Sequence, residues 1–109
     1  MFVSVIVESG SVDSGEAIFS ILSQFGFKKV QKFCWENMNF AESSLSSLKK
    51  NIDNITDYYD TIRFYQFPIN EMFVITELRQ KKWRRCQFKS AQIKSPIKKN
   101  LPKKSVSPK

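Results

Sequence analysis

The chain has 109 residues, enough for one small domain, and its ten Phe, three Tyr and two Trp exclude a wholly disordered protein. Its net charge of +8 is uneven, because residues 1–60 carry five Lys and Arg against eight Asp and Glu, whereas residues 61–109 carry thirteen against two. Such a basic half indicates a polyanionic partner, and the absence of a long apolar face beside the charges argues against a membrane.

The apolar segment Phe2–Val7 is rich in β-branched residues. It predicts a central strand that is covered on both faces or by a partner. It is not read as a signal peptide, because no basic stretch precedes it and Glu8 follows it. On that reading the widely spaced Cys34 and Cys86 are expected to be reduced thiols, and the protein is expected to be cytoplasmic.

A helix is predicted next, beginning near Ser14, because Asp13 and Glu16 have the spacing of a capping box. Gly26 is expected to end this helix in a left-handed conformation. Its apolar face would consist of Ala17, Ile18, Ile21, Leu22 and Phe25. A strand over residues 27–35 follows, then a turn at Glu36-Asn37 and a short returning strand over 38–40.

A second helix is predicted after Ser43 or Ser44, with an apolar stripe made of Leu45, Leu48, Ile52 and Ile55. Residues 61–67 predict a strand in which Ile62, Phe64 and Gln66 lie opposite Arg63, Tyr65 and Phe67. Pro68 is expected to stop this strand. A further strand is predicted over residues 71–78.

The resulting order, βαββαβ, is that of an α+β domain of the ferredoxin-like type, with two helices on one face of an antiparallel sheet. The strand over 71–78 has no free central place in such a sheet. It therefore either extends the edge or crosses to a second subunit. The domain is expected to cover residues 1–85, and the Pro- and Lys-containing residues 86–109 are expected to form a basic flexible tail, with 94–109 as a mobile electrostatic extension.

The segment 79–85 is the strongest binding signal in the sequence. It places five cations around one aromatic ring, and its members are Arg79, Lys81, Lys82, Trp83, Arg84 and Arg85. Cations that neutralise phosphates beside a stacking ring are typical of nucleic-acid binding, although such a run can also serve only solubility. A second basic group, formed by Lys28, Lys29 and Lys32, is interpreted equally as a phosphate-facing patch or as the protection of a sheet edge.

Three stretches resemble the family of CRISPR-associated protein 2, the small dimeric subunit of the spacer-acquisition complex. They are the opening strand Phe2–Val7; the run Gln31-Lys32-Phe33-Cys34-Trp35-Glu36-Asn37, which is similar to a family strand and turn of pattern Q-x-S-V-F-E-G; and Asp60-Thr61-Ile62-Arg63-Phe64-Tyr65, which is similar to D-S-I-R-I-Y. The resemblance covers roughly the first 78 residues. Small toxin ribonucleases, the virulence-associated D proteins, share the fold.

The resemblance implies a homodimer that exchanges the last strand of each chain, a duplex DNA lying across the dimer, and an integrase partner, CRISPR-associated protein 1. It also implies a Mg²⁺ ion held by one carboxylate from each subunit at the end of the first strand. The matching residue is Glu8 where the family has aspartate, and Mg²⁺ demands near-ideal geometry that the longer side chain alters. The chain has no His to act as a general base.

The leading hypothesis is therefore a non-catalytic, DNA-binding scaffold of spacer acquisition. The alternatives are a Mg²⁺-dependent endonuclease that uses Glu8 from both subunits and a toxin-like endoribonuclease. Whether the protein is an enzyme stays open at this point. Asp13 and Glu16 are assigned to the helix cap rather than to a second metal site.

Overall fold

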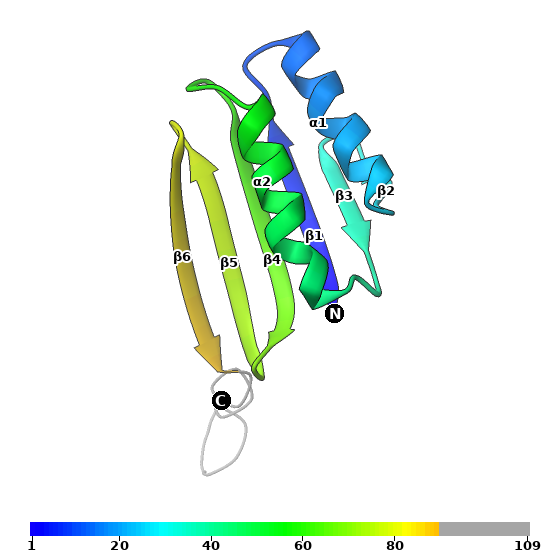
Figure 1. The fold of residues 1–109 in the computed structure, drawn as a ribbon, viewed down its shortest axis with the longest axis vertical. Coiled ribbons are helices and arrows are strands. Elements are labelled where there is room, and N and C mark those ends of the chain that lie inside the picture. Colours follow the sequence, from blue (N-terminus) through cyan, green and yellow to red (C-terminus); the bar gives the residue numbers. More distant parts are fainter. Residues whose placement is uncertain (90–109) are drawn as a thin grey trace, which may run out of the picture.

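The computed structural model describes residues 1–89 and shows an α+β fold with one six-stranded antiparallel sheet (Figure 1). The strands lie in the order β2-β3-β1-β4-β5-β6. Both helices, α1 and α2, cover the same face of the sheet (Figure 1). The elements are β1 (Phe2–Glu8), α1 (Val12–Gln24), β2 (Lys28–Gln31), β3 (Cys34–Asn37), a 3-10 turn (Glu42–Ser44), α2 (Leu45–Ile55), β4 (Thr61–Ile69), β5 (Met72–Arg79) and β6 (Lys82–Lys89).

Strand β1 occupies a central position, as its composition predicts, but the helices cover only one of its faces. Its alternate residues Val3, Val5 and Val7 are at most 1% exposed and form the core with apolar side chains of the two helices. On the other face Ile6 remains 42% exposed. The expected cover on both faces is therefore absent within residues 1–89, and we call this uncovered side of the sheet the open face.

Helix α1 begins two residues earlier than expected, and its cap is Ser11 rather than Asp13. The Ser11 hydroxyl accepts a hydrogen bond from the Ser14 backbone N–H at 3.1 Å. Asp13 lies inside the first turn, where its charge favours the positive end of the helix dipole, so the proposed capping box is wrong. The stop at Gly26 is confirmed by its φ of +85°.

The hairpin after α1 turns earlier than the sequence indicated. The single strand expected over residues 27–35 is divided into β2 and β3 by a turn at Lys32 and Phe33, and Glu36-Asn37 lies in β3 instead of forming the turn. The returning strand expected over 38–40 is likewise wrong. The physical reason is that all of β2 is exposed, so no buried face imposed an alternating pattern that could locate the turn.

The loop before β4 is organised around Asp60, which is 1% exposed. Its carboxylate accepts hydrogen bonds from the Gly10 N–H at 2.8 Å, the Ser14 hydroxyl at 2.6 Å and the Asp57 N–H at 2.9 Å. Desolvation alone would raise the pKa of Asp60, but the hydrogen bonds from Ser14, Gly10 and Asp57 together hold the pKa below its ordinary value. Asp60 thus joins the β1–α1 loop to the start of β4.

The second half of the chain forms a three-stranded meander, β4-β5-β6. In β4 the alternation of Ile62, Phe64 and Gln66 toward the core is confirmed, since all three are 0% exposed. Pro68 does not stop the strand, which continues to Ile69 through an irregularity in its pairing with β5. In the single chain β5 pairs with β4, the edge-extending alternative of the two that the sequence left open.

Ordered structure also continues beyond the expected domain boundary. Residues 86–89, which were assigned to the tail, lie in β6 and pair with β5. The remainder of the expected tail, residues 90–109, lies outside the described residues.

Candidate nucleic-acid interface

The basic segment 79–85 folds as a β-hairpin rather than as an extension of one strand. Arg79 pairs directly with Lys82, so Gln80 and Lys81 form a two-residue turn, with φ of +53° and +61°. Such turns match the twist of a hairpin but usually contain Asn or Gly, which tolerate a positive φ. Gln-Lys carries none of these signals, so β6 was not predicted from the sequence.

The hairpin divides the predicted binding residues between the two faces of the sheet. Cross-strand partners share a face, and Trp83 and Arg85 lie opposite Leu78 and Thr76, which are buried beneath the helix layer. Lys82 and Arg84 therefore project from the open face, together with Arg79. The predicted binding residues of this segment therefore do not form one continuous surface.

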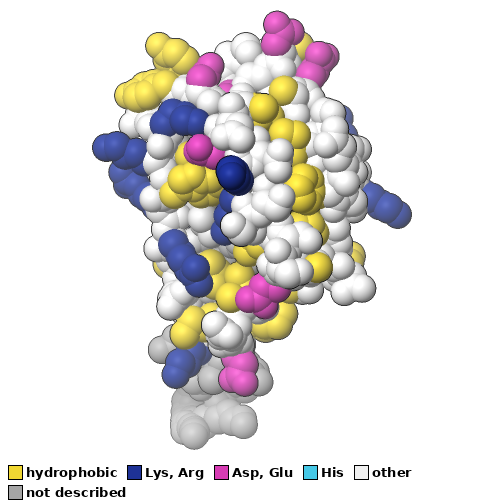
Figure 2. Space-filling model, viewed as in Figure 1, with side chains coloured by type: hydrophobic (Ala, Val, Ile, Leu, Met, Phe, Trp, Pro, Cys, Tyr) yellow, Lys and Arg dark blue, Asp and Glu magenta, His cyan; other side chains and the backbone are white. Residues whose placement is uncertain are grey.

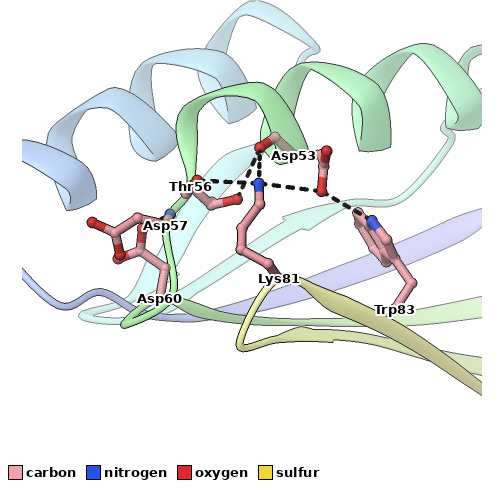
Figure 3. Close-up of polar contacts among 6 residues, drawn as sticks. All are labelled: Asp53, Thr56, Asp57, Asp60, Lys81 and Trp83. Carbon is pink, nitrogen blue, oxygen red and sulfur yellow. Dashed lines mark hydrogen bonds and ion pairs between the residues drawn. The ribbon is translucent and has the colours of Figure 1, made fainter.

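Lys81 and Trp83 both bind the end of α2 (Figure 3). The Lys81 ammonium donates to the Asp53 carbonyl at 2.6 Å and the Thr56 carbonyl at 3.2 Å, and it lies 3.5 Å from the Asp53 carboxylate. The Trp83 indole N–H donates to the same carboxylate at 3.1 Å, and its ring lies 5.9 Å from that of Phe64. These contacts satisfy the last carbonyls of the helix and complement its dipole.

This arrangement gives structural contacts to two of the predicted site residues. Lys81 caps the end of α2 and Trp83 covers the edge of the core, while both residues stay exposed. Their contact with nucleic acid stays a prediction. The sequence signal was the density of charge, which does not reveal that Asp53, 28 residues earlier, accepts the lysine.

The open face carries its charges in two rows across the strands. Strand pairing places Glu8, Thr61, Arg79 and Lys82 in the first row and Ile6, Arg63, Glu77 and Arg84 in the second. Arg63 and Glu77 lie 3.9 Å apart and are both accessible to solvent, so this ion pair contributes little to stability. The four cations of these rows, Arg63, Arg79, Lys82 and Arg84, are all exposed.

The far end of the same face is aromatic. Phe2 pairs with Phe67, Phe73 pairs with Phe88, and the rings of Phe67 and Phe73 lie 5.9 Å apart. The Phe73 and Phe88 rings stack at 5.5 Å. The open face therefore grades from charged rows near the β5–β6 turn to an aromatic row at the opposite end.

Glu8 lies at the charged end, in a depression that it lines with Ile6, Val7, Ser9 and Phe33. Its carboxylate is exposed. Among residues 1–89 no three carboxylate, thiol or imidazole groups come together in a way that could hold a metal ion.

The second predicted patch lies at the other edge of the sheet. Lys28 and Lys29 belong to β2, and Lys32 lies in the following turn with its ammonium 5.3 Å from the centre of the Phe33 ring. Four strands separate β2 from β6, so the structure does not bring this patch together with the hairpin. In the helix-side view of Figure 2, Lys and Arg side chains gather mainly along the side that β5 and β6 occupy.

Two cations near the hairpin were not predicted as binding residues, because neither lies in a dense run of cations. Arg63 could have been found from the β4 alternation, which places it opposite the buried Ile62 and Phe64. Lys49 lies on α2 and is half-buried against β5, and no signal in the sequence distinguishes it from the neighbouring Lys50.

Comparison with protein-family models finds no match for this chain, and comparison with curated proteins finds none either. Neither helix of the described part is long and apolar enough to cross a membrane. The functional reading therefore depends on the arrangement of the side chains.

Proposed function

We propose that this protein binds double-stranded DNA as a dimeric, non-catalytic scaffold of a CRISPR spacer-acquisition complex, together with the integrase that the resemblance implies. The observation that carries the binding proposal is the charged end of the open face. There Arg63, Arg79, Lys82 and Arg84 are exposed beside two carboxylates, Glu8 and Glu77. The four cations outnumber the two anions on a surface that the helices leave free. Such a surface neutralises phosphates without reading bases.

The topology supports the ferredoxin-like part of the proposal. The order β2-β3-β1-β4 with antiparallel neighbours, and two helices on one face, is what that arrangement requires. In a homodimer that exchanges β5, the residue pairs that β5 makes with β4 of its own chain would form instead with β4 of the other copy. The aromatic row of the open face offers apolar area that a second copy would remove from water.

Replacing Arg79, Lys82 and Arg84 together by Ala should make duplex binding much less salt-dependent. Each phosphate contact contributes roughly 0.9 to the slope of log affinity against log salt, so three lost contacts should lower the slope by about 2.7. The measurement is a fluorescence-anisotropy titration of a DNA duplex at several NaCl concentrations.

Two control variants sharpen this experiment. Lys81→Ala removes one positive charge from the same hairpin, but its ammonium is bound to α2, so it should lower the melting temperature and leave the slope nearly unchanged. Lys28→Ala with Lys29→Ala and Lys32→Ala tests the opposite edge. An unchanged slope in the Arg79, Lys82 and Arg84 variant would remove the open face as the DNA surface.

A Mg²⁺-dependent endonuclease is the second candidate, and the position of Glu8 favours it. Its exposed carboxylate shares a row with Arg79 and Lys82, so it would lie beside a bound backbone. On this reading, Glu8→Ala abolishes Mg²⁺-dependent cleavage of DNA or RNA and leaves the salt slope of binding intact. The scaffold proposal expects no Mg²⁺-dependent cleavage by the unaltered protein. Cleavage that Glu8→Ala abolishes would contradict the scaffold proposal and support the endonuclease.

A further inference from the structure

A second cationic feature lies on the helix side of the sheet, where β5 and β6 extend beyond α2 (Figure 1). A groove of about 400 Å³ runs there between the start of α2 and the β-meander. Its lining residues are Glu42, Leu45, Ser46, Lys49, Ile69 and Arg85. Arg85 and Arg84 are neighbours in β6 and point to opposite faces, so this groove is separate from the proposed DNA surface.

Within the described part of the chain, the two cations of the groove have no carboxylate partner within ion-pair distance. The Lys49 ammonium donates to the Thr76 hydroxyl at 3.1 Å and lies 5.6 Å from the centre of the Phe64 ring. Arg85 donates from Nε to the Gln87 side-chain oxygen at 3.1 Å. Within residues 1–89 the ion pairs are Arg63–Glu77 and Lys81–Asp53, and Glu42 at the groove is within 4 Å of neither cation.

The position of Lys49 is fixed by a buried polar network. Thr76, which is 6% exposed, also accepts a hydrogen bond from the Gln66 amide at 3.1 Å, and the same amide donates to the Val74 carbonyl at 3.0 Å. Lys49 lines the groove, and these contacts hold its ammonium against the sheet rather than extended into solvent. Desolvation by burial and the charge of Arg85 lower the pKa of Lys49 to about 8.

A bound anion would offset both the desolvation cost of burying the Lys49 charge and the repulsion between Lys49 and Arg85. Arginine offers a planar fork of N–H donors that matches phosphate oxygens, lysine adds a compact charge, and the Ser46 hydroxyl at the groove offers a further donor. Two cations also match the two charges that a phosphate monoester carries near neutral pH.

We propose that this groove binds a phosphate group, with Arg85 and Lys49 as its ligands. The group could be supplied by a small phosphate-bearing molecule or by the 5′-phosphate at the end of a nucleic-acid strand. The site does not depend on the proposed duplex surface, since it uses none of the open-face cations.

The test is a titration of the full chain with inorganic phosphate at pH 8. Isothermal titration calorimetry should show saturable binding, weakened on the order of tenfold or more in Arg85→Gln and in Lys49→Gln, because each loses a charge-assisted hydrogen bond. Lys50→Gln, an exposed neighbour on the same helix, should bind as the unaltered protein does. Arg85 lies on an exposed edge strand, so its replacement tests the site even if the Lys49 variant is unstable.

A spectroscopic measurement adds a readout specific to the site. In protein labelled with ¹³C-lysine, phosphate should move the pKa of Lys49 from about 8 back toward the ordinary lysine value. An unchanged Lys49 titration, or unaltered phosphate binding in Arg85→Gln, would overturn the proposal. The Arg79, Lys82 and Arg84 variant should retain phosphate binding, so a failure of the duplex surface and a failure of this groove are distinguishable.

Competition identifies the source of the phosphate. A 5′-phosphorylated oligonucleotide that displaces inorganic phosphate more effectively than its unphosphorylated counterpart would support the site and assign it to strand ends. Equal displacement by mononucleotides and by the phosphorylated oligonucleotide would support the site and assign it to small molecules.

Discussion

Replacing Asp60 by Asn should lower the free energy of unfolding by about 2–3 kcal/mol, since buried donors would lose their acceptor. The carboxylate receives hydrogen bonds from Gly10, Ser14 and Asp57, which belong to the β1–α1 loop, α1 and the loop before β4. An amide has only one oxygen, and its NH₂ group would face a donor. Urea denaturation of the two proteins at neutral pH measures the difference.

The effect should also depend on pH in a defined direction. Because the folded pKa of Asp60 lies below its unfolded value, its contribution is full above about pH 4 and is lost as the pH falls through the lowered folded pKa. The difference between the two proteins should therefore shrink toward acidic pH. Asp13→Asn, in an exposed part of the first helical turn, is the control and should change stability by only a few tenths of a kcal/mol. A gap of constant size down to pH 2 would contradict this role of the ionised carboxylate.

Replacing Phe64 by Ala should destabilise the fold by about 3–5 kcal/mol, the cost of a large cavity in a close-packed core. Phe64 is 0% exposed and lies against both the Trp83 ring and the Lys49 ammonium. The adjacent Tyr65 projects from the open face and is only partly buried. Tyr65→Ala should therefore cost about 1 kcal/mol, well below the value for a buried aromatic residue.

Denaturation at several protein concentrations completes the comparison of these two residues. The loss from Phe64→Ala should be the same at every concentration, since the helices of the same chain cover this residue. A cost for Tyr65→Ala as large as that for Phe64→Ala at low protein concentration would contradict the assignment of the open face as uncovered in the single chain. A cost that grows with concentration would support the proposed dimer.

The elements that the sequence predicted well are those in which burial imposes a period. The alternation of Ile62, Phe64 and Gln66 and the helical stripe through Leu48 and Ile52 both correspond to buried faces of the described structure. Gly26 was identifiable because a positive φ selects glycine. In each of these cases one class of residue makes the fold much more stable than the other classes would at that position.

The elements that were missed lack such a constraint. β2 is exposed along its whole length, and β6 is exposed at every residue except the partly buried Phe88, so neither shows a buried period. Ser11 and Asp13 are both good helix caps by type, and only the tertiary position of the loop decides between them. Charge alone could not separate Lys81 from Lys82, because the partner of Lys81 is supplied by a distant helix.

The strand order has a consequence for the sequence of events during folding. The meander β4-β5-β6 consists of adjacent hairpins, whereas β1 must pair with β4 across about 60 residues of chain. Long-range pairing is slow because loop closure costs entropy before contacts compensate for it. During synthesis β1 therefore waits for residues 61–67 before it gains its second neighbour. Until then the apolar segment Phe2–Val7 has an unpaired edge, which makes this interval the stage of synthesis most exposed to misassociation.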